Sequence, residues 1–234
     1  MRKKRDEYLG DGVMPIAGCD CPFIPVEYSG YTYGGVDNVG RIKAGYEPIF
    51  DYKTPGPEKK VKSRIHIVRA GVLDVKADAI VNAANKSLLG GGGVNGAIHK
   101  AAGPELLEEC RKLNGCRTGN VKITRAYNIK NASFIIHAIG PVYHGRQKDA
   151  GLLASCYYKS LELALKNGCK SIAFSGISTG GYGYPIEEAA EIAMYSVMVW
   201  YSLHRDTEMD VYFCCFREEE AVAYEKVFSK QKFY

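Results

Sequence analysis

Apolar, strand-like segments alternate with segments of helical periodicity from Ser63 to the end of the chain. Short runs rich in β-branched and aromatic residues predict strands at residues 65–68, 79–83, 121–127, 133–140, 171–177 and 209–216. Helical spacing of apolar residues predicts helices over 94–113 with a break at Pro104, over 150–168, over 185–204, and at the end of the chain. This alternation is typical of a mostly parallel sheet covered by helices on both faces.

The first 63 residues lack this alternation. Six of the nine prolines, nine glycines and six tyrosines fall here, and no helical or strand period persists. Stretches such as "YSGYTYGGVDNVG" favour turns and extended pieces, while the tyrosines argue against a fully disordered tail. We therefore expect an irregular Tyr/Gly/Pro-rich N-terminal extension over residues 1–63, laid over a single α/β domain at residues 64–234.

Composition narrows the class of protein. The chain has 234 residues, of which 46% are hydrophobic and 24% charged, as in a globular protein with a substantial core. No apolar run reaches membrane-spanning length, and the basic start "MRKKR" has no hydrophobic segment behind it, so we expect a cytoplasmic protein without a membrane partner. The net charge of +5 is spread out, and lysines and aromatics do not interleave along one element, which makes nucleic acid an unlikely partner.

The eight cysteines form no C-x-x-C pair, and no cysteine–histidine cluster has the spacing of a zinc site. We therefore expect reduced thiols and no bound metal. His99, in a predicted helix, and His137, in a predicted strand, are expected to have core or helix-cap roles. Ser178 lacks the G-x-S-x-G context of a nucleophilic serine.

Two glycine-rich loops follow predicted strands. The first glycine loop is "LLGGGGVNG" at residues 88–96, and the second is "STGGYGYP" at residues 178–185. Ligands bind at the carboxyl ends of strands in open α/β sheets, and backbone N–H groups at helix N-termini suit anions. No lysine follows the glycines as in a kinase-type loop, and Glu108 and Glu109 lie in a helix rather than at a strand end as a dinucleotide site requires. The loops are either tight turns or a two-sided diphosphate clamp, and their equivalent positions favour the clamp.

Asparagines stand beside the first glycine loop. Asn82 and Asn85 follow or end a buried strand, where an amide can recognise hydroxyls and carbonyls without carrying charge. Asn82 is either a turn residue that holds its own backbone or a ligand contact. Asn85 lies nearer the glycines, which favours ligand contact.

The segments "DAIVNAANKSLLGGGGVNGAIHKAAG", "GCRTGNVKIT", "FIIHAIGP" and "ISTGGYGYPIEEAA" closely resemble the macrodomains, in particular the MacroD-type group, from about Ile65 to Phe228. The resemblance implies a three-layer α/β/α sandwich with a mixed, mostly parallel sheet. Macrodomains bind ADP-ribose, and MacroD-type members hydrolyse it from modified acidic side chains or from O-acetyl-ADP-ribose. The implied partner is ADP-ribose or an ADP-ribosylated protein, and no cofactor is implied.

The resemblance also implies roles for individual residues. Asn85 would contact the distal ribose, Tyr182 would pack on that ribose, and Phe216 would lie near the adenine. Asn85 and Asn95 are the candidate catalytic residues, and Asn82 remains a candidate ligand contact. The diphosphate would be lined on one side by Gly91, Gly92, Gly93 and Val94, and on the other by Ser178, Thr179, Gly180 and Gly181.

The chain departs from the MacroD pattern at two positions. Asn95 stands where these enzymes have an aspartate that orients or activates the attacking water, and an asparagine can hold that water but cannot take its proton. Gly71 stands where the family has an adenine-reading aspartate, and Asp74 would substitute only if the loop is rearranged. Two functions follow: a hydrolase or deacetylase with slow chemistry, or a reader that binds ADP-ribose without cleavage.

Overall fold

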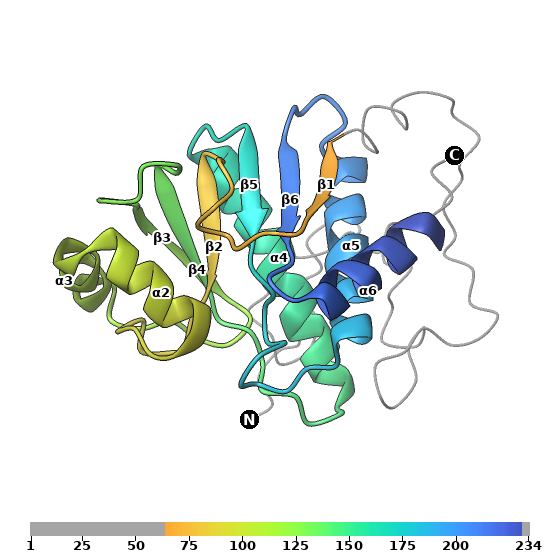
Figure 1. Cartoon of the computed structure of the whole chain (residues 1–234), viewed down its shortest axis with the longest axis horizontal. Coiled ribbons are helices and arrows are strands. Elements are labelled where there is room, and N and C mark those ends of the chain that lie inside the picture. The colour runs from red at the N-terminus through yellow and green to blue at the C-terminus, as the bar shows by residue number, and fades with distance from the viewer. Residues whose placement is uncertain (1–63, 231–234) are drawn as a thin grey trace, which may run out of the picture.

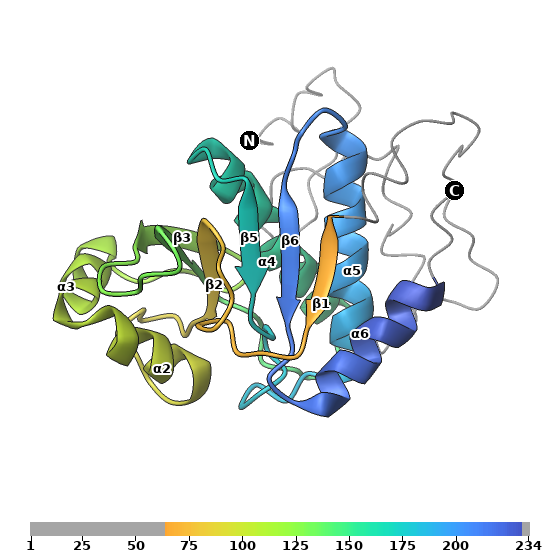
Figure 2. The ribbon, with the colours of Figure 1, turned by 45° about the horizontal axis from the view of Figure 1, so that its top comes forward.

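The structure, a computed structural model, describes residues 64–230. The extension expected over residues 1–63 lies outside the described residues. The strands are β1 (Ile65–Val68), β2 (Ala79–Ala83), β3 (Val121–Arg125), β4 (Phe134–Ala138), β5 (Ser171–Phe174) and β6 (Asp210–Cys214). They form one sheet in the order β1-β6-β5-β2-β4-β3 (Figures 1 and 2), in which only the β3–β4 pair is antiparallel. The prediction of a mixed, mostly parallel sheet is confirmed.

The helices are α2 (Gly93–Ala102), α3 (Pro104–Leu113), α4 (Gln147–Lys166), α5 (Ile186–Leu203) and α6 (Glu218–Lys230). The expected break falls between α2 and α3, because Pro104 lacks a backbone N–H and occupies the first turn of α3. Pro185 is the residue before α5, whereas the sequence predicts it at the first position of that helix.

Helices cover both faces of the sheet. Along β2, Ala79 and Val81 pack into the core formed with α4, α5 and α6, whereas Ile80 packs into the core formed with α2 and α3. Successive strand side chains point to opposite faces, so this alternation places one helical layer on each side. In Figure 2, α5 runs alongside β1 and α4 lies behind β5 and β6, whereas α2 and α3 lie at the end of the sheet formed by β2 and β3. The three-layer sandwich is confirmed.

The carboxyl ends of the parallel strands meet at one edge of the sheet, where both glycine loops lie. The first glycine loop connects β2 to α2, and the second connects β5 to α5. Among residues 64–230, every helix is too short or too polar to cross a membrane.

Candidate functional site

A cavity of about 400 Å³ lies between the two glycine loops. This volume falls within the range of small-molecule sites, about 300–1,000 Å³. Its lining, as far as the described chain goes, contains no charged side chain and consists of Ala83, Ala84, Asn85, Gly92, Gly93, Val94, Asn95, Gly140, Gly176, Ile177, Ser178, Gly180, Gly181 and Tyr182. A ligand's negative charge would therefore meet backbone N–H groups and neutral polar side chains.

The start of α2 forms one wall of this cavity. Gly92 precedes the helix and Gly93 opens it, and within residues 64–230 no side chain caps the helix N-terminus. The first N–H groups of a helix lack intrahelical partners and carry partial positive charge. This wall therefore offers donors to an anion.

Asn85 braces the first glycine loop while lining the cavity. Its Nδ2 donates to the Gly90 carbonyl at 2.7 Å, and its Oδ1 accepts from the Ser87 hydroxyl at 2.8 Å and from the Leu88 N–H at 3.1 Å. Its amide is thus engaged within the loop. A contact between Asn85 and a ribose stays a prediction.

The second glycine loop has a strained and closely packed start. Ser178 has a φ of 66°, a left-handed conformation that non-glycine residues rarely adopt. Its hydroxyl is buried and, within the described residues, has no hydrogen-bond partner. A Cβ added to Gly140 would collide with this hydroxyl and with Ile177, so the loop after β4 requires glycine there. Strain of this kind clusters at ligand sites.

Asn82, Asn95 and His137 form a buried network behind the cavity. Asn82 is fully buried and is not among the described residues that line the cavity, and its contact with a ligand stays a prediction. Its Nδ2 donates to Asn95 Oδ1 at 2.8 Å and lies 3.1 Å from His137 Nδ1. Asn82 therefore fixes which face of the Asn95 amide meets the cavity.

The orientation of Asn95 follows from this network. Because Asn95 Oδ1 accepts from Asn82, the Nδ2 group is left for other partners, and it lies 3.3 Å from the position of a Cβ on Gly91. An amide nitrogen donates hydrogen bonds and has no free lone pair to take a proton. At this position the chain offers a donor, where an aspartate would offer an acceptor.

His137 is held neutral. Burial, and secondarily the neighbouring His99, lowers the pKa of His137 to about 3. Its Nδ1 accepts from Asn82, so its Nε2 carries the proton and donates to Thr124 Oγ1 at 3.0 Å. The expected structural role of His137 agrees with this geometry.

The fold also brings together three groups that could bind a metal. The ligand atoms of His99, Cys110 and His137 lie within 4.8 Å of one another, a set suited in type to zinc. Both ring nitrogens of His137 already have hydrogen-bond partners, and burial raises the pKa of Cys110 to about 11, which disfavours the thiolate. We describe the set as a packed polar cluster, and the absence of metal stays a prediction.

The Asp74 carboxylate lies where a side chain at position 71 would begin. Asp74 Oδ2 lies 2.8 Å from the position of a Cβ on Gly71, and the Asp74 N–H donates to the Gly71 carbonyl at 2.9 Å in a turn. Phe216, 84% exposed, lies 3.8 Å from the same point. A carboxylate is thus present beside the aromatic ring, and recognition of adenine by Asp74 stays a prediction.

The structure gathers most of the predicted site residues at the cavity. The lining contains Asn85, Gly92, Gly93, Val94, Asn95, Ser178, Gly180, Gly181 and Tyr182. Four predicted residues lie outside the described lining: Asn82, Gly91, Thr179 and Phe216. Asn82 is buried behind Asn95, and Gly91 lies close to the side-chain amides of Asn85 and Asn95. Thr179 is directed toward α6, and Phe216 lies at the Gly71 turn. Sequence reasoning missed Gly140 and Gly176, although each lies at the carboxyl end of a predicted strand.

Comparison with known proteins agrees with this geometry. The family model of the Macro domain matches residues 81–193. A macro domain-containing protein of Chlorobaculum tepidum is 54% identical over 163 residues, which cover 69% of this chain and 94% of that protein. An O-acetyl-ADP-ribose deacetylase of Citrobacter koseri is 48% identical over 176 residues, covering 73% of this chain and 98% of the relative.

Solved structures give the same result. The Trypanosoma brucei macrodomain in complex with ADP-ribose matches with a TM-score of 0.67 and 43% sequence identity, covering 73% of this chain and 72% of that one. Sequence, fold and the cavity between two glycine loops therefore agree, and this chain belongs to the macrodomain family.

Proposed function

We propose that this chain binds ADP-ribose in the cavity between the glycine loops and slowly hydrolyses it from mono-ADP-ribosylated acidic side chains, or deacetylates O-acetyl-ADP-ribose. The partner is free ADP-ribose or an ADP-ribosylated protein, and the expected compartment is the cytoplasm. The free thiols of the six cysteines between Arg64 and Lys230 agree with a reducing compartment.

The single observation that carries the binding proposal is the uncharged cavity between the two loops. A diphosphate can approach the start of α2 from one side and the backbone of Gly180 and Gly181 from the other, because none of these glycines has a side chain in the way. The related macrodomain of known structure holds ADP-ribose. Ligand class and cavity chemistry agree.

Hydrolysis requires a water at the reacting carbon and a group that takes its proton. In release from a modified acidic side chain, water attacks the anomeric carbon, the bond to the side-chain oxygen breaks, and the carboxylate leaves. Asn95 can hold this water by donation but cannot act as the base. The ligand's own diphosphate is the remaining base in the cavity, so turnover is expected to be slow by the 10²–10⁴-fold that a general base typically contributes. The name of the Citrobacter koseri relative supports the deacetylase alternative.

A second candidate, a reader without turnover, is favoured by the orientation of Asn95. Its amide is held by Asn82 with the nitrogen free, which suits a ligand oxygen better than a water that must lose a proton. In this case the same cavity binds ADP-ribosylated proteins without cleaving them.

The binding proposal is tested by calorimetric titration of the purified chain with ADP-ribose, with ribose 5-phosphate as the ligand that lacks the nucleotide half. We expect one ADP-ribose per chain and much weaker binding of ribose 5-phosphate. Absence of binding at millimolar ADP-ribose would contradict the proposal.

The two candidates are separated by single-turnover release of ADP-ribose from a protein modified on glutamate, measured for the native chain and for Asn95→Asp at saturation. If the site is a slow hydrolase, the new carboxylate should raise the release rate about tenfold or more, within the range of a general base. No release by either protein would identify a reader. Equal release by both would assign activation of the water to another group.

A further inference from the structure

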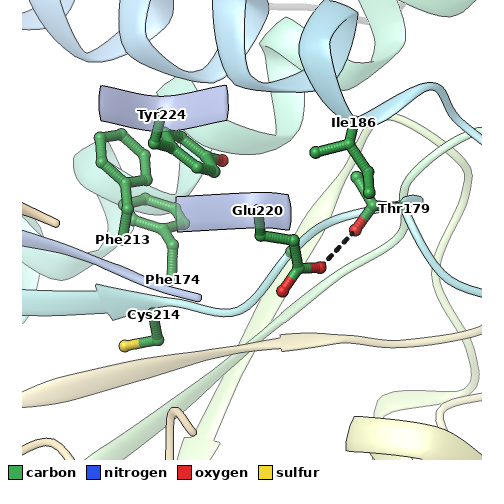
Figure 3. A pocket seen from close by; sticks show the side chains of 8 residues that line it. Phe174, Thr179, Ile186, Phe213, Cys214, Glu220 and Tyr224 are labelled. Atoms are coloured by element: carbon green, nitrogen blue, oxygen red, sulfur yellow. Dashed lines mark hydrogen bonds between the residues drawn. The ribbon is translucent and has the colours of Figure 1, made fainter. Parts of the chain in front are cut away.

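The second glycine loop is fastened to the start of α6 through Thr179. The Thr179 hydroxyl donates to Glu220 Oε1 at 3.4 Å, and Arg217 Nη2 donates to the Thr179 carbonyl at 3.3 Å. In Figure 3 the Glu220 side chain points toward Thr179. Both the side chain and the backbone of one loop residue are therefore held by one end of one helix.

The Glu220 carboxylate is also held by hydrogen bonds from Arg217 at the start of α6. Glu220 is the third residue of α6 and 8% exposed, and its Oε2 accepts from the Arg217 N–H at 3.1 Å. Its Oε1 accepts from Arg217 Nη2 at 2.9 Å. A glutamate that reaches back to the N–H preceding the helix is half of a capping box, which orients the carboxylate.

The approach between loop and helix leaves little room for movement. A Cβ on Gly176 would lie 2.5 Å from the Thr179 hydroxyl and 3.2 Å from Glu220 Oε1. The cavity that remains beside Gly176, Thr179 and Glu220, shown in Figure 3, measures about 10 Å³. Position 176 must therefore be glycine for Thr179 and Glu220 to approach each other in this way.

Thr179 lies between two residues that line the large cavity, Ser178 and Gly180. Holding its hydroxyl and its carbonyl restricts the backbone that leads to Gly180 and Gly181. We propose that Glu220 and Arg217 are positioning residues that hold the second glycine loop in the conformation that receives a diphosphate. The proposal rests on the proposed function for the identity of the ligand and extends the site to a helix outside the cavity.

The charge of the pair fits this role. Glu220 is an anion close to a loop proposed to bind an anion, and the Arg217 guanidinium pairs with it at 2.9 Å while the Arg217 backbone N–H donates a second hydrogen bond. The acceptor atom, rather than the negative charge, is what Thr179 requires. Glutamine at this position keeps an acceptor and should therefore serve, whereas alanine should not.

The experiment compares Glu220→Ala, Glu220→Gln and Thr179→Val. Glu219→Ala is the matched control, because Glu219 also pairs with Arg217, at 2.8 Å, but makes its ion pair on the exposed side. Two quantities are measured: the dissociation constant for ADP-ribose, and hydrogen exchange of the amides of residues 179–183 without ligand.

We expect Glu220→Ala and Thr179→Val to weaken ADP-ribose binding about tenfold and to speed amide exchange in the loop, as loss of a hydrogen bond does. Glu220→Gln should restore most of both, and Glu219→Ala should change neither. Unchanged exchange and affinity in Thr179→Val and Glu220→Ala would overturn the inference. If the native chain does not bind ADP-ribose, the proposed function fails, and the exchange measurement still decides the positioning role. If Glu220→Ala does not fold, Thr179→Val tests the same bond from the loop side.

Discussion

Single polar atoms decide what this site can do. The Asn82 Nδ2 group donates to both Asn95 Oδ1 and His137 Nδ1. Asn95 therefore presents its own amide nitrogen, a donor, to the cavity. Asp74 supplies a carboxylate at the side-chain position of Gly71. Asn95 thus offers a donor to the cavity, and Asp74 places a carboxylate beside Phe216.

Asp74 is expected to read adenine, if the base lies at Phe216 as the family resemblance implies. A carboxylate accepts a hydrogen bond from the exocyclic amine of adenine, whereas hypoxanthine has a carbonyl at that position. Asp74→Ala should weaken binding of ADP-ribose about five- to thirtyfold, the effect of losing a hydrogen bond worth about 1–2 kcal/mol, and should bring the affinities for ADP-ribose and inosine diphosphate ribose closer together. Calorimetric titrations measure both.

The control for this prediction is Asp206→Ala, which removes an exposed carboxylate from the turn that leads into β6, at the amino end of that strand. This variant should bind both ligands as the native chain does. Sharp discrimination that survives in Asp74→Ala would assign adenine recognition to another residue.

His137 is expected to make stability depend on pH. Its pKa is about 3 in the folded state, against about 6.5 when unfolded. Between these values the unfolded chain binds a proton that the folded chain does not, so this contribution to stability is complete above about pH 6.5 and is lost as the pH falls toward 3. The slope is at most about 1.4 kcal/mol per pH unit for one proton.

Denaturant unfolding at several pH values from 4 to 7.5 measures this slope in the native chain and in His137→Gln. The variant should be less stable near neutral pH and should show a shallower dependence below pH 6.5. His144→Gln, which replaces an exposed ring, is the control. An unchanged slope in His137→Gln would show that other groups control the acid response.

At the scale of elements, two glycine loops and the start of α2 build much of the cavity. β2 and β5 are adjacent and parallel, so the loops that follow them emerge side by side at the same edge. The α2 N-terminus contributes uncapped donors, and the second glycine loop contributes a backbone free of side chains. Neither loop encloses the cavity alone.

Gly180 tests this arrangement. A Cβ at Gly180 would have no described atom within 4 Å, and its φ is not left-handed, so a side chain is accommodated by the fold but projects into the cavity. Gly180→Glu should leave the melting temperature almost unchanged and lower ADP-ribose affinity about a hundredfold or more, because it adds bulk and a like charge beside the diphosphate. Calorimetry and thermal unfolding measure the two effects.

Gly180→Gln separates the two causes, because it has nearly the same size without the charge. We expect an intermediate loss of affinity. Native affinity in a folded Gly180→Glu protein would exclude this loop from the diphosphate site.

At the scale of the whole molecule, the described lining of the cavity comes from residues 83–182, in the middle of the described domain. The sheet that holds them is completed by β6 and β1. The site therefore depends on the domain as a unit, and the boundary at residue 64 remains a proposal.

A chain limited to residues 64–234 is expected to fold and to bind ADP-ribose, because it keeps every described residue that lines the cavity. It should melt at a lower temperature than the full chain, because the sequence predicts that the Tyr-rich extension packs on the domain. Circular dichroism and calorimetry measure folding and affinity. A large loss of affinity in a folded truncated chain would show that residues 1–63 contribute to the site.

The sequence by itself determined the order of strands and helices, the break at Pro104 and the two glycine loops at equivalent strand ends. Each of these depends on local information: side-chain periodicity, proline geometry and the backbone freedom of glycine. Most of the cavity lining could be predicted for the same reason, because loops that follow parallel strands share one edge of the sheet.

Only the tertiary structure decided which side chains meet. Asn82 contacts His137 because β2 and β4 pair in a register that places these residues opposite each other, on the face toward α2. Thr179 contacts Glu220, which lies 41 positions later in the sequence. A turn brings the Asp74 carboxylate to the place where a side chain at position 71 would begin. Contacts of this kind depend on register, strand order and side-chain direction together, and residue spacing along the chain does not encode any of the three.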